Sequence, residues 1–361
     1  MTDTDYIPLS KPYTGSEELD NLSDCLQRDK LSGDGEYTKL CERQLQEECG
    51  AARVLLTTSC TAALELCAHL LEVGPGDEVI MPSFTFVSTA NAFVLRGAKI
   101  VFADIEPGTL NLNPDDVARK VTPATKIIVA MHYAGVACNM SALNGLAIRN
   151  GLHIVEDAAQ GVFSKWKGQF LGTIGTLGAF SFHDTKNFTS GEGGALLINN
   201  HALEERAEIL REKGTNRQQF ILGNVDKYTW MDVGSSYIPS ELSAAVLHAQ
   251  LQKASRITAL RKRAHKLYDE LLEPLCERGV LERPVIPGYA ESNYHLYAVR
   301  LADAATRDGI MVHLNANAIG ATFHYIPLHT SPMADVLGIS GDPLPVTETA
   351  AACLLRLPLY A

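Results

Sequence analysis

The sequence predicts an α/β protein, with a mostly parallel sheet in a large domain and a smaller C-terminal α+β domain. The first observation is that, up to about residue 200, short apolar runs typical of strands alternate with longer segments of helical periodicity. That alternation favours a parallel sheet covered by helices on both faces. The second observation is the length of 361 residues, which corresponds to about two domains. We predict the large domain over residues 1–250 and the small domain over residues 251–361.

Composition is that of a soluble globular protein and argues against several functional classes. Apolar residues make up 46% of the chain and charged residues 20%, which is ordinary for a globular protein. The formal net charge of -11 disfavours non-specific nucleic-acid binding, which needs a basic surface. The eight cysteines include no C-x-x-C pair, and no apolar run is long enough to span a membrane. Since the N-terminus has no secretory pattern, we expect a cytoplasmic protein, and the scattered histidines indicate no metal site.

The first predicted strand leads into a hydroxyl-rich turn. Helical patterns at 17–28 and 37–49 precede this strand, and the second is typical of an amphipathic surface helix. The β-rich run 53–57 is followed by TSCT at 58–61, which opens an apolar helical segment. Free backbone amides and the helix dipole at such a start favour an anion, so the turn is a candidate phosphate site. The alternative is an ordinary Ser/Thr helix cap.

The middle of the chain continues the alternation of strands and helices. The predicted elements are a strand within 74–82, a helix within 83–98, a strand at 99–104, a helix at 113–120, a strand at 126–131 and a helix at 140–150. The carboxyl ends of parallel strands meet at one edge of the sheet, where α/β proteins bind their ligands. We therefore expect one cleft to collect the residues that follow five strands, at 58–61, 84–86, 132–135, 157–160 and 181–186.

Two of these strand ends carry groups that suggest a cofactor. The stretch 179–196, AFSFHDTKNFTSGEGGAL, places Lys186 after a buried strand and beside a glycine-rich loop. The stretch 152–161, LHIVEDAAQG, ends an apolar strand in two carboxylates, the second of which is Asp157. Alone, such a lysine is more often the solvated edge of a turn. Together, a lysine for a Schiff base and an acid for a pyridine nitrogen point to pyridoxal phosphate.

The C-terminal part departs from the alternation. Residues 201–213 are predicted as a helix, and the stretch up to 236 is polar, aromatic and loop-like. Residues 239–272 are predicted as one long helix or a bent pair, and we interpret their Arg and Lys run as a solvated face. The domain boundary is placed there. Beyond it we predict a strand at 294–301, a helix at 304–318 and a strand at 321–325.

With these pieces assembled, the chain resembles the DegT/DnrJ/EryC1 family of nucleotide-sugar aminotransferases, which are fold-type I pyridoxal-phosphate enzymes. The resemblance covers almost the whole chain and rests on TSCTAALE, MPSFTFVSTANA, HYAGVACNM, VEDAAQG, FSFHDTKN with GEGGAL, and FHYIPLH. Two stretches, SFTFVSTANAFVLRGAKIVF and REKGTNR, are similar to the subgroup of the dTDP-4-amino-4,6-dideoxygalactose transaminase type. The resemblance also implies a homodimer with shared active sites.

The resemblance implies a role for each residue that matches a family motif. Lys186 matches the Schiff-base lysine and proton-moving base, and Asp157 matches the acid at the pyridine nitrogen. Phe86 matches the aromatic residue stacked on the ring, although an ordinary core phenylalanine is the alternative. Gln160 matches the side chain near the phenolic oxygen. The matches to the phosphate site are Cys60, Thr61 and Ser181, with Ser236 where many relatives have an asparagine supplied by the neighbouring subunit.

On the substrate side, the resemblance implies contacts from two stretches. A diphosphate linker favours fixed cations and polar partners, for which the residues of KGTNR and the following loop are candidates. His324 and His329, with Tyr325 between them, match a stretch that lines the sugar-nucleotide site in the family, and for His324 the alternative is a core histidine. We interpret His183 as a structural histidine. The candidate substrate residues are Lys213, Asn216, Arg217, Tyr228, Tyr325 and His329.

The activity implied is transfer of an amino group from L-glutamate to C4 of dTDP-4-keto-6-deoxy-D-glucose, giving a dTDP-4-amino-4,6-dideoxy sugar, with the galacto product favoured. Alternatives are the gluco epimer, another keto-sugar nucleotide, a sugar dehydratase that uses the same cofactor, or a non-catalytic regulatory relative. Related dehydratases carry histidine in place of the lysine, so Lys186 discriminates against that class. A nicotinamide dehydrogenase is remote, since no G-x-G-x-x-G follows a strand in the first half.

Overall fold

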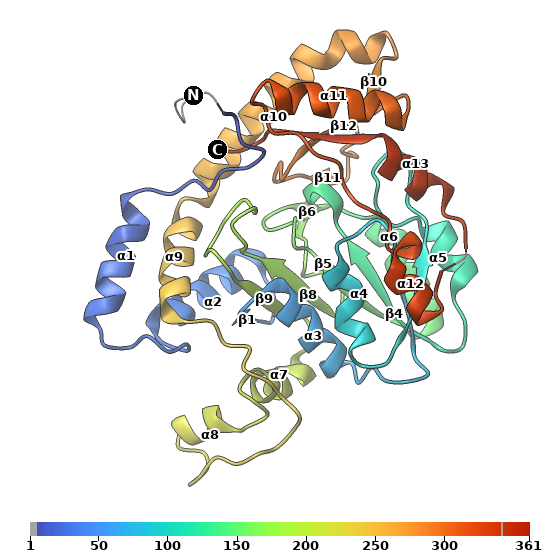
Figure 1. Cartoon of the computed structure of the whole chain (residues 1–361). Coiled ribbons are helices and arrows are strands. Elements are labelled where there is room, and N and C mark those ends of the chain that lie inside the picture. The colour runs from blue at the N-terminus through green and yellow to red at the C-terminus, as the bar shows by residue number, and fades with distance from the viewer. Residues whose placement is uncertain (1–5, 341) are drawn as a thin grey trace.

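The computed structural model describes residues 6–340 and 342–361, and it is built on a seven-stranded sheet (Figure 1). The strand order is β1-β9-β8-β5-β4-β2-β3, with β1 and β8 antiparallel to β9 and all other neighbours parallel. The prediction of a mostly parallel sheet is confirmed. The strands are β1 (Arg53–Thr57), β2 (Glu78–Pro82), β3 (Lys99–Ala103), β4 (Thr125–Met131), β5 (His153–Asp157), β8 (Leu177–Ser181) and β9 (Gly194–Ile198).

Helices cover both faces of this sheet because its strands are apolar on both sides. Val155 and Val129 pack in the cluster on α3, whereas their neighbours Ile154 and Ile128 pack on the opposite face with Met140 of α6. The helices of this part are α1 (Ser16–Gln27), α2 (Glu36–Cys49), α3 (Cys60–Leu70), α4 (Val87–Val94), α5 (Pro114–Lys120), α6 (Met140–Asn150), α7 (Glu204–Arg211), α8 (Arg217–Ile221) and α9 (Glu241–Gln252). Short 3-10 helices are η1 (Tyr133–Gly135) and η2 (His201–Leu203).

The C-terminal part is a small α+β unit at the top of the view in Figure 1. Its antiparallel sheet runs β10 (Leu281–Glu282), β12 (Tyr297–Leu301) and β13 (Leu354–Leu357). A separate three-stranded sheet joins β11 (Ala290–Glu291) to β6 (Lys165–Trp166) and β7 (Gln169–Phe170). The helices are α10 (Ala254–Glu277), α11 (Ala304–Ala316), α12 (Pro332–Leu337) and α13 (Pro345–Cys353), with the 3-10 helix η3 (Leu328–Thr330). Among the described helices, none is both long enough and apolar enough to cross a membrane.

Two local expectations are resolved by the structure. The stretch 239–272 is a bent pair, because α9 ends at Gln252 and α10 starts at Ala254. The strand predicted at 321–325 is wrong: only Thr322 forms a bridge, to Arg356, after which the chain crosses to the large sheet. There the phenol of Tyr325 accepts a hydrogen bond from Gln160, and this long-range contact replaces further strand pairing.

The division of the chain at residue 250 stays a prediction. It falls close to the break between α9 and α10. The N-terminal strip contacts the C-terminal part, since the Ile7 amide donates to the Ala318 carbonyl at 2.9 Å and the Ile7 carbonyl accepts from the Gly320 amide at 2.8 Å. The N-terminal strip, which belongs to the predicted large domain, is therefore hydrogen-bonded to the small unit.

Candidate active site

A cavity of about 350 Å³ lies at the carboxyl ends of the parallel strands. Residues that follow β1, β2, β5 and β8 line it from the large sheet, as expected for an α/β protein. The small unit closes it with His295, His324, Tyr325 and Arg356. One chain thus brings together eight of the predicted residues, namely Cys60, Thr61, Phe86, Asp157, Gln160, Ser181, Lys186 and Tyr325.

Lys186 supplies an amine to this cavity without a fixed partner. It follows β8, and its backbone amide donates to the His183 carbonyl at 2.9 Å. Among the described residues its Nζ forms no ion pair or hydrogen bond. Burial lowers the pKa of the Lys186 amine, although Cys60 and Asp157 act in the opposite direction. A larger fraction of the amine is therefore neutral near pH 7 than for an exposed lysine, and a neutral amine is nucleophilic.

Asp157 is held in place by hydrogen bonds at the end of β5. Its side chain is buried, with 5% of the residue exposed. Thr89 Oγ1 donates to Oδ2 at 2.7 Å, and the Ala159 amide donates to Oδ1 at 3.2 Å. Thr89 belongs to α4 and is itself 2.8 Å from Thr85 Oγ1. These contacts orient a carboxylate that has no cation bound to it among the described residues.

The start of α3 forms a seat for an anion. Ser59 caps the helix, its Oγ accepting from the Ala62 amide at 3.1 Å, and the first turn carries amides with no partner inside the helix. Gly194 of β9 lies against this turn: a Cβ there would be 2.4 Å from the Cys60 nitrogen. Only glycine allows the strand to approach so closely. Ser181, the last residue of β8, lines the same cavity.

Phe86 and Phe84 have opposite environments. Phe84 is fully buried and contacts Tyr133 and Tyr325, whereas Phe86 is 58% exposed and lines the cavity at the start of α4. The alternative of a core phenylalanine therefore does not hold for Phe86. A flat apolar ring at the edge of the cavity is suited to stacking on an aromatic ligand.

Gln160 links the two parts of the chain through Tyr325. Its Oε1 accepts from the Ala134 amide at 2.7 Å, and its Nε2 donates to the Tyr325 phenol at 2.7 Å. Burial raises the pKa of Tyr325, so the phenol keeps its proton. Next to it, His324 Nδ1 lies 3.1 Å from the Tyr133 phenol. Burial, together with Arg356 and Lys186, lowers the pKa of His324 to about 2, which makes this imidazole neutral.

The remaining predicted residues lie outside this cavity in the single chain. His329 is buried, with Nδ1 2.7 Å from Ser83 Oγ and Nε2 3.2 Å from Glu348. Lys213 pairs with Glu212 at 2.9 Å, and the Asn216 side chain accepts from the Thr229 amide. The segment after α7, which projects from the body near α8 in Figure 1, holds Lys213, Asn216, Arg217, Tyr228 and Ser236.

Among the cavity-lining residues that the sequence argument missed are Thr89, His295 and Arg356. Thr89 holds Asp157, and a threonine in the first turn after the stacking aromatic was the available signal. For Arg356 the signal was a charged residue inside the apolar run LLRLPL. No local pattern indicated His295. Within the described ranges, no group of three or more His, Cys, Asp or Glu side chains is placed to hold a metal ion.

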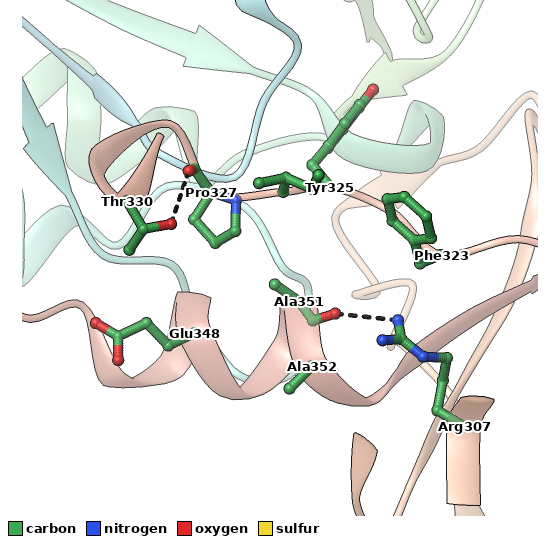
Figure 2. Close-up of a pocket in the computed structure, with 9 residues that line it drawn as sticks. Arg307, Phe323, Tyr325, Pro327, Thr330, Glu348, Ala351 and Ala352 are labelled. Atoms are coloured by element: carbon green, nitrogen blue, oxygen red, sulfur yellow. Dashed lines mark hydrogen bonds between the residues drawn. The ribbon is translucent and has the colours of Figure 1, made fainter. Parts of the chain in front are cut away.

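A second pocket of about 400 Å³ adjoins the first and shares Tyr325 with it (Figure 2). Figure 2 shows it between α13, which supplies Glu348 and Ala351, and the segment from Phe323 to Thr330. The Arg307 guanidinium borders it and donates to the Ala351 carbonyl at 3.3 Å. This pocket is more open to the surface than the cavity lined by Lys186.

The sequence pattern of the DegT/DnrJ/EryC1/StrS aminotransferase family matches residues 12–361. The chain belongs to this family. It is 33% identical over 363 residues to the dTDP-4-dehydro-2,3,6-trideoxy-D-glucose 4-aminotransferase of Saccharopolyspora spinosa, covering 98% of this chain and 92% of that protein. It is 30% identical to the GDP-perosamine synthase of Caulobacter vibrioides, covering 100% of this chain and 95% of that one.

Solved structures agree with this assignment. The aminotransferase TlmJ from Streptoalloteichus hindustanus has a TM-score of 0.91 at 34% identity, covering 98% of this chain and 94% of that one. The pyridoxal-phosphate form of the putative sugar aminotransferase Spr1654 from Streptococcus pneumoniae has a TM-score of 0.90 at 26% identity, covering 99% and 94%. The predicted family, fold type, pyridoxal-phosphate cofactor and sugar-aminotransferase class are thus confirmed.

The cavity fits pyridoxal phosphate. The cofactor has four parts that need a partner, and the cavity offers one for each. The unpartnered amine suits its aldehyde, and the carboxylate without a cation suits its ring nitrogen. The exposed aromatic ring suits its ring face, and the helix N-terminus suits its phosphate. All four line the same space, although they come from the ends of different strands. The role of each individual residue stays a prediction.

Proposed function

We propose that this family member transfers an amino group from L-glutamate to C4 of dTDP-4-keto-6-deoxy-D-glucose, giving the dTDP-4-amino-4,6-dideoxy sugar of galacto configuration. The observation that supports transamination is the presence of Lys186 and Asp157 in one cavity with the start of α3. The similarity of SFTFVSTANAFVLRGAKIVF and REKGTNR to one subgroup supports the acceptor. Two relatives whose names refer to nucleotide or amino sugars support the broader substrate class.

In this proposal the cavity residues divide the work. Lys186, Asp157, Phe86 and Gln160 hold the cofactor ring, and Cys60, Thr61 and Ser181 hold its phosphate. The bound cofactor supplies an electron sink that makes the proton on the carbon beside the transferred nitrogen acidic. The Lys186 amine would hold the cofactor at its aldehyde carbon, and during turnover its unprotonated form would accept and return the proton that moves. The carboxylate of Asp157 would stabilise a positive charge on the ring nitrogen of the cofactor.

The sugar-nucleotide acceptor needs space in addition to the space that the cofactor takes in the cavity. The neighbouring pocket, which meets the cavity at Tyr325, offers space for the part of the sugar nucleotide that lies beyond the reacting sugar. We further propose a homodimer with shared active sites, in which the partner's copy of the segment 213–236 completes the site. This proposal accounts for the candidate residues of this segment that do not line the cavity of their own chain.

Lys186→Ala tests the proposed function. Wild-type protein with pyridoxal phosphate, L-glutamate and dTDP-4-keto-6-deoxyglucose is expected to form an amino sugar, and NMR of the product determines the configuration at C4. The variant is expected to lose activity by at least about 1,000-fold and to lose the visible absorbance of lysine-bound cofactor, while its thermal midpoint is retained. Lys39→Ala, on the exposed face of α2, is the matched control.

Several results would contradict the proposal. Retained activity in the Lys186→Ala variant would remove the assigned role of this lysine. An equatorial amine would assign the gluco epimer, and loss of a hydroxyl without amination would assign a dehydratase. No turnover of any keto-sugar nucleotide by wild-type protein with bound cofactor would favour a regulatory relative.

A further inference from the structure

The Arg356 guanidinium lines the catalytic cavity without a partner from the protein. Its Nε is buried and has no hydrogen-bond acceptor, and across the described residues its side chain forms no hydrogen bond or ion pair. A guanidinium carries five N–H donors, and leaving buried donors of a charged group unmatched is costly. A cation without a protein partner at this cavity is suited to bind an anionic group that enters from solution.

The position of Arg356 is fixed by the strand that carries it. On one side β13 pairs with β12, where Arg356 stands opposite Ala298. On the other side the Arg356 amide donates to the Thr322 carbonyl at 2.7 Å, and the Thr322 amide donates back at 3.3 Å. The neighbouring Leu355 packs in the core of the small unit, so strand alternation turns Arg356 toward the large sheet. Backbone held on both sides makes this a preorganised site.

The surroundings of the guanidinium lack a counter-charge. Asp157 and Glu192 are the carboxylates that line the cavity; the first accepts hydrogen bonds from Thr89 and Ala159, and the second lies near His183 at 3.6 Å. Neither pairs with Arg356. The basic groups whose pKa the charge of Arg356 lowers are Lys186, Arg261, His295 and His324, and none of them supplies a negative charge. An anionic ligand group would therefore remove repulsion as well as satisfy the unmatched donors.

We propose that Arg356 binds the α-carboxylate of the amino-acid donor. The planar guanidinium matches a carboxylate through two parallel N–H···O bonds. The inference rests on the proposed function, because it needs an amino acid to react at the position of the Lys186 amine. Arg356 then orients the donor so that the proton on its α-carbon faces Lys186.

The distance from the reacting atom favours the donor over the nucleotide. In an amino acid the carboxylate is bonded directly to the carbon that loses its nitrogen. In the sugar nucleotide the ring separates C4 from the diphosphate, so that group lies farther from Lys186. The cofactor phosphate has its own seat at the start of α3, on amides and hydroxyls rather than on Arg356. The amino-acid carboxylate is thus the anion that fits beside Lys186.

The test compares ligands that differ only at one carboxylate. Cofactor-loaded wild type, Arg356→Gln and Arg356→Lys are titrated with L-glutamate, L-glutamine and L-isoglutamine, the last having an amide in place of the α-carboxylate. Dissociation constants come from the change in cofactor absorbance, and 2-oxoglutarate binding is measured by calorimetry. Arg300→Gln is the control, because this arginine lies on the neighbouring β12 and pairs with Glu282.

Arg356→Gln is expected to weaken L-glutamate, L-glutamine and 2-oxoglutarate roughly 10- to 100-fold, the range for hydrogen bonds to a charged group. L-isoglutamine and dTDP are expected to change less than about twofold, and Arg356→Lys to restore part of the loss. Equal weakening of L-isoglutamine, selective weakening of dTDP, or unchanged L-glutamate binding would overturn the inference. Amino-acid binding is measured without a sugar acceptor, so a wrong acceptor in the proposed function would not alter these outcomes.

Discussion

At the scale of single residues, the site depends on what surrounds an amine and a carboxylate. Lys186 is half-buried at the cavity, and burial lowers its pKa against the opposing effect of Cys60 and Asp157. Asp157 keeps a carboxylate oriented by Thr89 and by a backbone amide. These two groups are ordinary in solution, and their usefulness comes from the environment in which the fold holds them.

The shifted pKa of Lys186 predicts how cofactor binding depends on pH. Only the neutral amine bonds to an aldehyde. The rate constant for loading pyridoxal phosphate onto cofactor-free protein is therefore expected to rise with pH to a plateau, with the midpoint of the rise below pH 10.5. Arg356→Gln is expected to move this midpoint upward, because Arg356 is one of the groups that lower the pKa. Stopped-flow absorbance measures the rate.

The lowered pKa of Lys186 also predicts how the free energy of unfolding changes with pH. Between the lowered pKa and 10.5, the unfolded chain binds more protons at this lysine than the folded chain does. The contribution of Lys186 to the free energy of unfolding of cofactor-free protein therefore rises with pH through that window and falls as the pH is lowered. A loading midpoint at or above 10.5 would contradict both statements, and Lys39→Ala should leave the profile unchanged.

At the scale of elements, the anion seat depends on the close approach of β9 to the start of α3. Gly194, the first residue of β9, faces Ser59 and Cys60 at the start of α3. An added Cβ at Gly194 would be 2.4 Å from backbone atoms of both residues. Backbone cannot move aside as a flexible side chain can. The absence of a side chain at one strand position therefore decides whether the helix start keeps its place.

Gly194→Ala is expected to displace the start of α3. We expect weaker pyridoxal-phosphate binding by about tenfold or more and a free energy of unfolding lower by about 1–3 kcal/mol, the usual range for an overpacked position. Cofactor titration and urea denaturation measure the two effects. Gly309→Ala is the control: it lies in α11 with nothing near an added Cβ, and it should stabilise the protein by up to about 1 kcal/mol. Unchanged cofactor affinity in Gly194→Ala would show that the seat tolerates this shift.

At the scale of the whole molecule, one segment of the surface has the composition of an interface. The part of the chain from α8 to the loop before α9 exposes several large apolar side chains close together in sequence. Trp230 is 77% exposed, and the others are Phe220, Ile221, Leu222, Tyr228, Met231 and Val233. Exposed apolar groups of this kind favour a protein partner. The proposed homodimer would cover them.

Trp230→Asp is expected to weaken the proposed dimer by at least roughly 30-fold, because it removes a large aromatic anchor and would bury a charge. Sedimentation velocity across a concentration series measures the change. Ile148→Asp is the matched control, since Ile148 on α6 is 82% exposed and lies apart from this segment. If sites are shared, the monomeric variant should also lose activity. A Trp230→Asp variant that stays dimeric would place the interface elsewhere.

Much of the fold follows from local pattern. The helix at 140–150 has its predicted bounds, and the strands that carry Asp157 and Ser181 were expected from short apolar runs. That Asp157 and Lys186 meet was also predictable, because parallel strands bring their carboxyl ends to one edge. For 239–272 the sequence left open whether the stretch is one long helix or a bent pair, because periodicity does not indicate where a helix breaks.

By itself, the sequence determined the α/β class, the family and the residues that its motifs carry, because these depend on short-range periodicity and on contiguous residues. Only the tertiary structure decided that Phe86 is exposed at the cavity, that 321–325 is not a strand and that Arg356 lines the same cavity as Lys186. These features depend on which distant strands pair and which face of each is packed. A strand shows the same local alternation whichever face is buried, so the direction in which Arg356 points is fixed only when β13 is seated between β12 and Thr322.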